Sequence, residues 1–269
     1  AIVLLIQLAL YLDGDAYIQF LLSTIPAFTV EGKLGEGDIL NGYFVCYYIL
    51  QTLLIHVPLL IALVGGDMIA GEANMGTLRL LITKPISRTS LLLGKFLAST
   101  IYTLMLLTWM AFLSLFVSML VFGTGDLMVF QSETLILIPG HDVFWRYLSA
   151  FGFAAIAMTS VAALSFFLSL FAENSVGPIV ATMSVVIVFT ILTTMALPLF
   201  ELIKPYLFTS HMLGWKGFFD IEATEENVAL VGTVQSLPAI LRSAGILIFY
   251  ILLFVTLTIV LFRRKDVLS

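Results

Sequence analysis

The sequence predicts an all-α membrane protein with six transmembrane helices, and two observations lead to that prediction. Apolar residues make up 61% of the 269 residues and charged residues only 11%, whereas soluble domains carry about a quarter charged residues. The apolar residues also gather into long runs, and about 20 such residues are enough to cross a bilayer as a helix. We therefore expect lipid to surround most of the chain.

Six apolar runs follow one another along the chain, and none alternates in the manner of barrel strands, so each is expected to be helical. The first run, 1–12, is too short to span a bilayer, and we interpret the sequence as lacking the start of this helix. The other five runs are 42–66, 91–122, 144–171, 176–200 and 239–262. They predict a single membrane domain over residues 1–269.

The positions of lysine and arginine predict the orientation, because these residues favour the cytoplasmic side of a membrane. If the basic C-terminal end is cytoplasmic, six spans also place 67–90 and 172–175 inside. The bases on that side are then Arg79, Lys84, Arg88, Lys95, Arg263, Arg264 and Lys265. The outer loops are left strongly acidic. We expect both termini to be cytoplasmic, in the cytoplasmic membrane of a bacterium or archaeon.

The loops on the predicted outer side contain apolar pieces of their own. Those within 13–41 and 123–142 are expected to lie along the membrane surface. The third loop, 201–237, is expected to hold one or two short helices before the sixth span. Thr224 is a candidate start for one of them, because acidic residues follow it in the first turn.

The connection between the second and third spans is unusual for its mixture of glycines, charges and a proline. Gly65 and Gly66 are expected to end the second span and Gly76 to end a short helix lying on the membrane. Thr77 would then cap a second short helix, which ends before Pro85 because proline disfavours helix in the residue before it.

The return into the membrane follows that second short helix. Ser87 or Thr89 is expected to cap the third span, and Arg88 and Lys95 are expected to reach lipid phosphates. A plain turn needs only a few residues, but this connection uses about 24, from 67 to 90. The residues alone leave two explanations open: a surface for a protein partner, or an amphipathic stretch resting on lipid.

Searches for catalytic motifs find none, so the chain is not predicted to be an enzyme. It has no serine elbow, no zinc-binding HExxH motif and no phosphate-binding loop, since Gly94-Lys95 lacks the required glycine before it and the hydroxyl after it. His141-Asp142 is the nearest approach to a catalytic pair, and we interpret it as a polar cap on the fourth span. No cofactor, metal or nucleic acid is expected on this chain.

Two polar residues lie inside the second run. Gln51 and His56 precede Pro58, which is expected to kink the helix. Polar side chains within a span can mark a substrate path, or they can form hydrogen bonds between helices. The sequence leaves both readings open.

The connection after the second span closely resembles the signature of ABC-2 type transporter permeases. The matching pieces are "GEANMGTL", "PISR" and "GK", and the polar loop "FAENS" after the fourth span agrees as well. The resemblance extends over most of the chain. It implies a homodimer or heterodimer of permeases, working with two cytoplasmic ABC ATPase subunits that hold ATP and magnesium. It also implies a cytoplasmic helix before the first span, and we expect this helix to belong to the part of the N-terminus that the sequence lacks.

The resemblance assigns roles to particular residues. A coupling helix and its surroundings would contact the ATPase through Asp67, Glu72, Gly76, Thr77, Leu78 and Arg79, and a second contact would use Glu173 and Asn174. Pro85, Arg88 and Lys95 would direct the chain back into the membrane, and Gln51 and His56 could line the translocation path.

The expected function is therefore a permease subunit of an ATP-driven exporter. The alternatives are an ATP-independent secondary transporter or channel, a maturation-system permease of the nitrous oxide reductase type, and an intramembrane enzyme or scaffold. The outer loops lack clusters of histidine, cysteine and methionine, which does not favour the maturation role. The substrate is not predicted.

Overall fold

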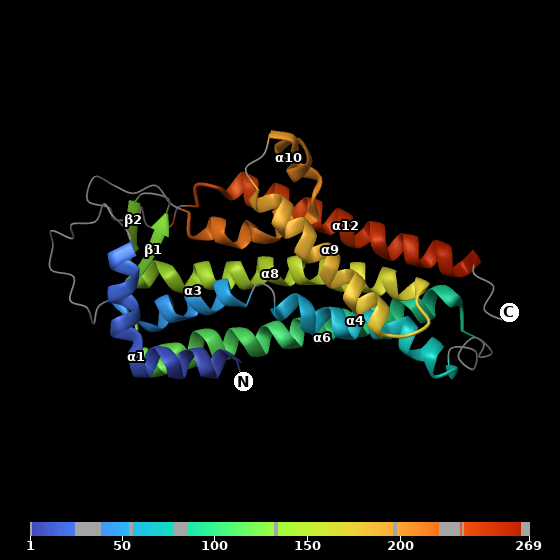
Figure 1. Ribbon diagram of the computed structural model, residues 1–269, viewed down its shortest axis with the longest axis horizontal. Coiled ribbons are helices and arrows are strands. Elements are labelled where there is room, and N and C mark those ends of the chain that lie inside the picture. The colour runs from blue at the N-terminus through green and yellow to red at the C-terminus, as the bar shows by residue number, and fades with distance from the viewer. Residues whose placement is uncertain are drawn as a thin grey trace. The chain divides into compact units, whose positions relative to one another are not determined.

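The computed structural model describes residues 2–24, 39–53, 56–77, 86–131, 134–195, 198–220, 232 and 234–264, and these are mostly helical (Figure 1). The chain divides into two compact units. The first comprises Ala1–Leu54, Leu107–Phe151 and Trp215–Leu237, and the second comprises Ile55–Leu106, Gly152–Gly214 and Pro238–Ser269. The prediction of a single domain stays a prediction.

Five helical segments of the described residues are long and apolar enough to cross a membrane, whereas six spans were expected. They are His56–Asn74, Arg88–Phe122, Gly140–Phe171, Val176–Thr193 and Leu237–Arg264. The first apolar run forms the beginning of α1 (Ile2–Thr24), whose backbone leaves the helical conformation at Asp13. The apolar part before this kink, Ile2–Gly14, is shorter than a span.

The second predicted span is two helices, α3 (Gly42–Thr52) and α4 (His56–Asn74). A kink was expected at Pro58, but α4 begins two residues before it, at His56. Proline suits this position because backbone amides in the first turn of a helix have no hydrogen-bond partner within the helix. The expectation that the span ends at Gly65-Gly66 is wrong, since α4 continues through both glycines to Asn74.

Close helix packing explains why these two glycines do not end α4. A Cβ atom on Gly65 would lie 3.0 Å from the Ala162 carbonyl oxygen, and one on Gly66 would lie 3.0 Å from Ile179. Glycine at both positions therefore lets α4 approach α8 (Gly140–Leu168) and α9 (Val176–Thr194) closely. Ser165 Oγ donates a hydrogen bond of 2.9 Å to the Ala62 carbonyl in the same interface.

The C-terminal end of α4 agrees better with the prediction from the sequence. Gly76 has a φ of +71°, a conformation that favours glycine, and it ends the helix as expected. Thr77 Oγ1 donates a hydrogen bond to the Glu72 carbonyl. Residues 78–85, where the coupling helix was expected, lie outside the described residues, and with them lie Leu78, Arg79 and Pro85.

The third span begins where it was expected and then changes its winding. Ser87 caps α6 (Arg88–Ala111), because its Oγ accepts a hydrogen bond of 3.0 Å from the Ser90 amide. The helix continues as a π-helix, η1 (Phe112–Val117), and ends as α7 (Ser118–Phe122). Gln7 Nε2 donates hydrogen bonds of 2.8 Å to the Leu113 carbonyl and to Ser118 Oγ at this change of winding.

The loop after α7 contains a β-hairpin, which the sequence analysis did not expect in this mostly helical chain. Strands β1 (Leu127–Gln131) and β2 (Thr134–Ile138) pair antiparallel, with Leu127 opposite Ile138. The β-branched residues of "TLILI" suit a strand. Met128 packs on Ile18 and Ile39, so the hairpin belongs to the core of the first unit.

The remaining spans begin close to their expected places, and where one or two short helices were expected before the sixth span the described residues hold four short helical segments. Helix α8 ends in the 3₁₀ turn η2 (Ser169–Phe171), and α9 packs against α4 (Figure 1). The short helices are α10 (Pro198–Ile203), η3 (Lys204–Tyr206), α11 (Phe208–Met212) and η4 (Leu213–Phe218). Helix α12 (Leu237–Arg264) follows, and the helix start expected at Thr224 lies outside the described residues.

Candidate functional site

A polar network at the end of α4 brings together several of the predicted site residues. It consists of Asp67, Glu72, Lys95 and Ser175, which we call the α4 network. Asp67 and Glu72 come from α4, Lys95 from α6 and Ser175 from the residue before α9. All four belong to the second unit.

The first half of the network joins α4 to α6. Lys95 forms an ion pair with Glu72, and its ammonium group also donates a hydrogen bond of 2.9 Å to the Met68 carbonyl. The side chains of Lys95 and Glu72 are 12% and 25% exposed. The expectation that Lys95 reaches lipid phosphates is therefore wrong, because its charge is engaged by α4. The other carboxylate oxygen of Glu72 is buried and has no hydrogen-bond partner among the described residues.

The second half of the network joins α4 to the loop before α9. Ser175 Oγ donates a hydrogen bond to Asp67 Oδ1. Gly71 leaves room for this carboxylate, since a Cβ atom on Gly71 would overlap Asp67 Oδ1. Asn174 Oδ1 accepts a hydrogen bond of 3.1 Å from the Gly177 amide in the first turn of α9, while Glu173 is exposed.

The turn beyond the network is exposed. Met75 is 68% exposed, and a Cβ atom on Gly76 would meet nothing within 4 Å. Ile86, on the return toward α6, is also exposed. Arg88 Nη1 donates a hydrogen bond of 3.5 Å to the Arg263 carbonyl near the end of α12, which connects this return to the last helix.

The two polar residues of the second predicted span fall in different units. Gln51 lies near the end of α3, where its Oε1 accepts a hydrogen bond of 2.8 Å from Lys216 Nζ. Burial lowers the pKa of Lys216 below its ordinary value. His56 is the first residue of α4 and is exposed. The sequence reasoning did not single out Lys216, although a lysine among the aromatic residues of "GWKGF" was a usable signal.

A second polar cluster, at the start of α8, also escaped the sequence reasoning. Arg146 donates to Asp142 Oδ2 through Nε at 3.0 Å and Nη2 at 2.6 Å, and through Nη1 to the Phe218 carbonyl at 2.8 Å. Asp142 Oδ1 accepts from Trp145 Nε1 at 2.7 Å and from the Gly232 amide at 3.1 Å. We call these contacts the α8 clasp. The i,i+4 spacing of Asp142 and Arg146 was the signal that could have found it.

The α8 clasp has a structural role. The side chains of Arg146 and Asp142 are 0% and 4% exposed, and their hydrogen bonds connect Phe218 and Gly232 to α8. This agrees with interpreting Asp142 as part of the polar start of the fourth span. Within the described ranges, no group of three or more histidine, cysteine, aspartate or glutamate residues could hold a metal ion.

Comparisons with known proteins agree with the resemblance seen in the connection after the second span. Residues 4–267 match the family model described as "ABC-2 family transporter protein". The chain is also similar to the "Uncharacterized protein YhcI" of Bacillus subtilis (strain 168), with 24% identity over 238 residues. That match covers 84% of this chain and 70% of the relative.

Proposed function

Because the chain belongs to the ABC-2 family of transporter proteins, we propose that it is the permease subunit of an exporter driven by ATP hydrolysis on separate subunits. Family membership makes the chain a multi-pass membrane transport component. The proposal adds the source of energy, the direction of transport and the partners. These are two ABC ATPase subunits, which hold ATP and magnesium, and a second permease chain in a homodimer or heterodimer.

The observation that supports this proposal most is the continuity of α4. The helix runs from His56 through the segment next to α8 and α9 to the exposed turn at Met75 and Gly76. A helix moves largely as a rigid element, so a push on this turn reaches the middle of the second unit. The α4 network ties the same helix to α6 and to the start of α9. One contact at the turn can therefore displace three helices together.

The predicted residues divide into four groups under this proposal. Gly76, Thr77, Leu78, Arg79, Glu173 and Asn174 form the surface that an ATPase contacts. Asp67, Glu72 and Lys95 transmit the movement, and Pro85 and Arg88 direct the chain back to α6. Gln51 and His56 remain candidates for the translocation path. With the positive-inside orientation, both termini and this surface face the cytoplasm.

Copurification and a substitution at the turn test the proposal. The chain is expressed together with a candidate ABC ATPase from the same organism, and copurification and transport-coupled ATPase activity are measured. Gly76→Trp is expected to abolish the coupling, because it adds bulk at the contact and needs a backbone conformation that tryptophan rarely adopts. Gly76→Asn is expected to retain it, because asparagine tolerates that conformation.

Gly123→Trp is the matched control. Gly123 also has a positive φ, of 74°, with no atom within 4 Å of an added Cβ, but it follows α7. It is expected to leave the coupling intact. If no ATPase copurifies and Gly76→Trp transports normally, the proposal is wrong, and an ATP-independent transporter or channel becomes the better explanation.

A further inference from the structure

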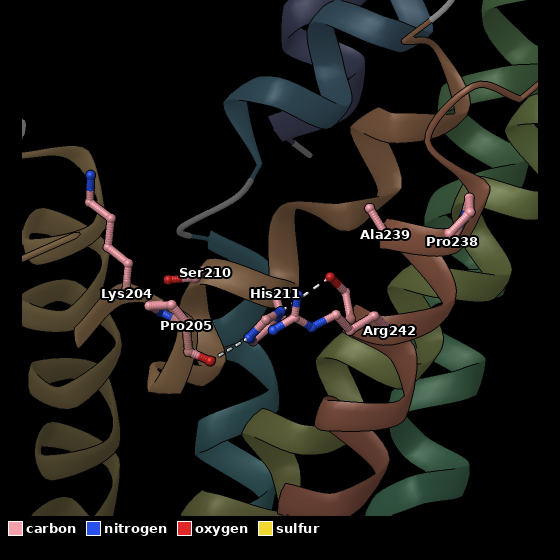
Figure 2. Close-up of a pocket in the computed structure, with 8 residues that line it drawn as sticks. Lys204, Pro205, Ser210, His211, Pro238, Ala239 and Arg242 are labelled. Atoms are coloured by element: carbon pink, nitrogen blue, oxygen red, sulfur yellow. Dashed lines mark hydrogen bonds between the residues drawn. The ribbon is translucent and has the colours of Figure 1, made fainter. Parts of the chain in front are cut away.

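A pocket of about 550 Å³ lies between the short helices η3 and α11 and the first turns of α12 (Figure 2). This volume is in the range of small-molecule sites, roughly 300–1,000 Å³. Three of the eight lining residues are basic and none is acidic. The lining residues are Lys204, Pro205, Ser210, His211, Pro238, Ala239, Arg242 and Ser243.

His211 holds the two walls of the pocket together. Its Nε2 lies 3.0 Å from the Pro205 carbonyl oxygen and its Nδ1 lies 3.1 Å from Ser243 Oγ, as the dashed lines in Figure 2 show. A carbonyl oxygen can only accept, so Nε2 donates the hydrogen to Pro205, and Nδ1 shares the second hydrogen bond with the Ser243 hydroxyl. The ring thereby fixes η3 relative to α12, and the cavity between them is preformed.

Two other lining residues offer donors that the described protein does not use. Arg242 is exposed, and it forms no ion pair with any acidic residue that the structure describes. Ser210 Oγ is buried, and it has no hydrogen-bond partner among the described residues. Lys204 differs from both, because Glu201 neutralises it. An unused arginine and an unsatisfied buried hydroxyl in one pocket are suited to an anion with several acceptor oxygens.

We propose that this pocket binds a phosphate-ester anion, with Arg242 as the charged anchor and Ser210 as a second donor. The arginine fork matches two phosphate oxygens, and a phosphate ester has further acceptor oxygens for a second donor. The volume leaves room for the group that the phosphate carries. Exposed apolar residues lie near the lining residues in sequence, at Leu202, Tyr206 and Leu241. The anion can therefore be the headgroup of a membrane phospholipid or a soluble phosphate ester.

Binding to the full chain, purified in a non-ionic detergent, tests the proposal with two probes. One is dihexanoyl phosphatidylglycerol below its micelle concentration, and the other is glycerol phosphate. Both carry the same phosphate ester, and only the first carries acyl chains. Dissociation constants are measured for the unmodified protein and for the variants Arg242→Gln, Arg242→Lys, Ser210→Ala and Arg264→Gln. Arg264 lies exposed at the other end of α12, so Arg264→Gln makes the same change in net charge away from the pocket.

We expect saturable binding that Arg242→Gln weakens about tenfold or more, since a hydrogen bond to a charged group is lost. The affinity of Arg242→Lys should lie between those of the unmodified protein and Arg242→Gln. Ser210→Ala should weaken binding several-fold, and Arg264→Gln should bind normally. Binding of the lipid alone identifies a headgroup site, and binding of both probes identifies a site for soluble phosphate esters. If neither probe saturates, or if Arg264→Gln and Arg242→Gln weaken binding equally, the proposal is overturned. Should Arg242→Gln fail to fold, Ser210→Ala and Arg242→Lys decide between the same outcomes.

Discussion

The α8 clasp and the α4 network are both built around an ion pair, but they differ in burial and in how many of their carboxylate oxygens have hydrogen-bond partners. In the α8 clasp the side chains are buried, and both oxygens of Asp142 accept hydrogen bonds. In the α4 network the side chains are partly exposed, and one oxygen of Glu72 is buried without a partner among the described residues. A fully satisfied buried cluster specifies one arrangement, whereas a partly satisfied one costs less to rearrange. We therefore interpret the α8 clasp as a fixed joint and the α4 network as a movable one.

Breaking the α8 clasp is expected to have the largest effect. Arg146→Gln leaves the carboxylate of Asp142 buried without its counter-charge, which typically costs about 3–5 kcal/mol. The expected result is a large drop in the temperature of thermal unfolding in detergent. The double variant Asp142→Asn with Arg146→Gln should recover much of the loss, because the buried charge is removed as well. A single variant as stable as the unmodified protein would show that the joint is not fixed.

Breaking the α4 network should lower stability less than breaking the α8 clasp does, and it should impair function more. Lys95→Met removes the ion pair with Glu72 at a partly exposed site, with an expected cost of about 1–2 kcal/mol. Under the proposed function it should also uncouple ATP hydrolysis from transport, which is measured in the copurified complex. Glu72→Gln serves as the companion variant, because it keeps the shape and removes the charge. A large stability loss with normal coupling would make this network a second fixed joint.

A substitution at Gly71 separates the two halves of the α4 network. Gly71→Ala should displace the carboxylate of Asp67 from Ser175, because the added Cβ atom would occupy its place. Alanine is favoured over glycine in a helix by roughly 0.5–1 kcal/mol, so the net change in stability should be below about 1 kcal/mol. Unfolding and transport measurements on Gly71→Ala and Ser175→Ala should give matching results. Disagreement between the two would locate the effect elsewhere than in this hydrogen bond.

The smallest expected effect concerns Lys216, a half-buried charge that donates a hydrogen bond to the neutral side chain of Gln51. Its pKa is lowered by burial from an ordinary value of 10.5. Between the lowered pKa and 10.5 the unfolded chain binds more protons than the folded one, so this lysine makes stability rise with pH in that window. The unfolding temperature relative to Lys216→Met should therefore increase as the pH approaches 10.5. A constant difference across that range would contradict the burial effect.

The sequence predicted the features that depend on local composition. Apolar runs located α8, α9 and α12, and the cap at Ser87 and the break at Gly76 followed from local chemistry. It was wrong about Gly65 and Gly66, because their role depends on how closely α8 and α9 approach, which only the tertiary structure defines. The hairpin was missed because two adjacent apolar stretches become strands only when they pair with each other.

The candidate site shows the same division. Motifs along the chain drew attention to Asp67, Glu72 and Lys95, but they did not show that Lys95 pairs with Glu72 or that Ser175 contacts Asp67. Those contacts join residues far apart in the sequence. Lys95 was assigned to lipid because basic residues near the end of a span usually reach the membrane surface. In the structure Lys95 pairs with the nearby carboxylate of Glu72 instead, and sequence spacing alone could not reveal that.

The π-helix η1 has a consequence for how the third span tolerates changes in length. A π-turn contains one residue more than an α-turn, so η1 absorbs an extra residue within Phe112–Val117. Deleting one residue there would let the segment relax to an α-helix, whereas deleting one residue from α6 or α7 would rotate everything beyond it by about 100°. The hydrogen bonds of Gln7 to Leu113 and Ser118 hold this wider turn open. η1 is thus the place in this helix where an insertion or deletion can be accommodated without turning the rest of the span onto a different face.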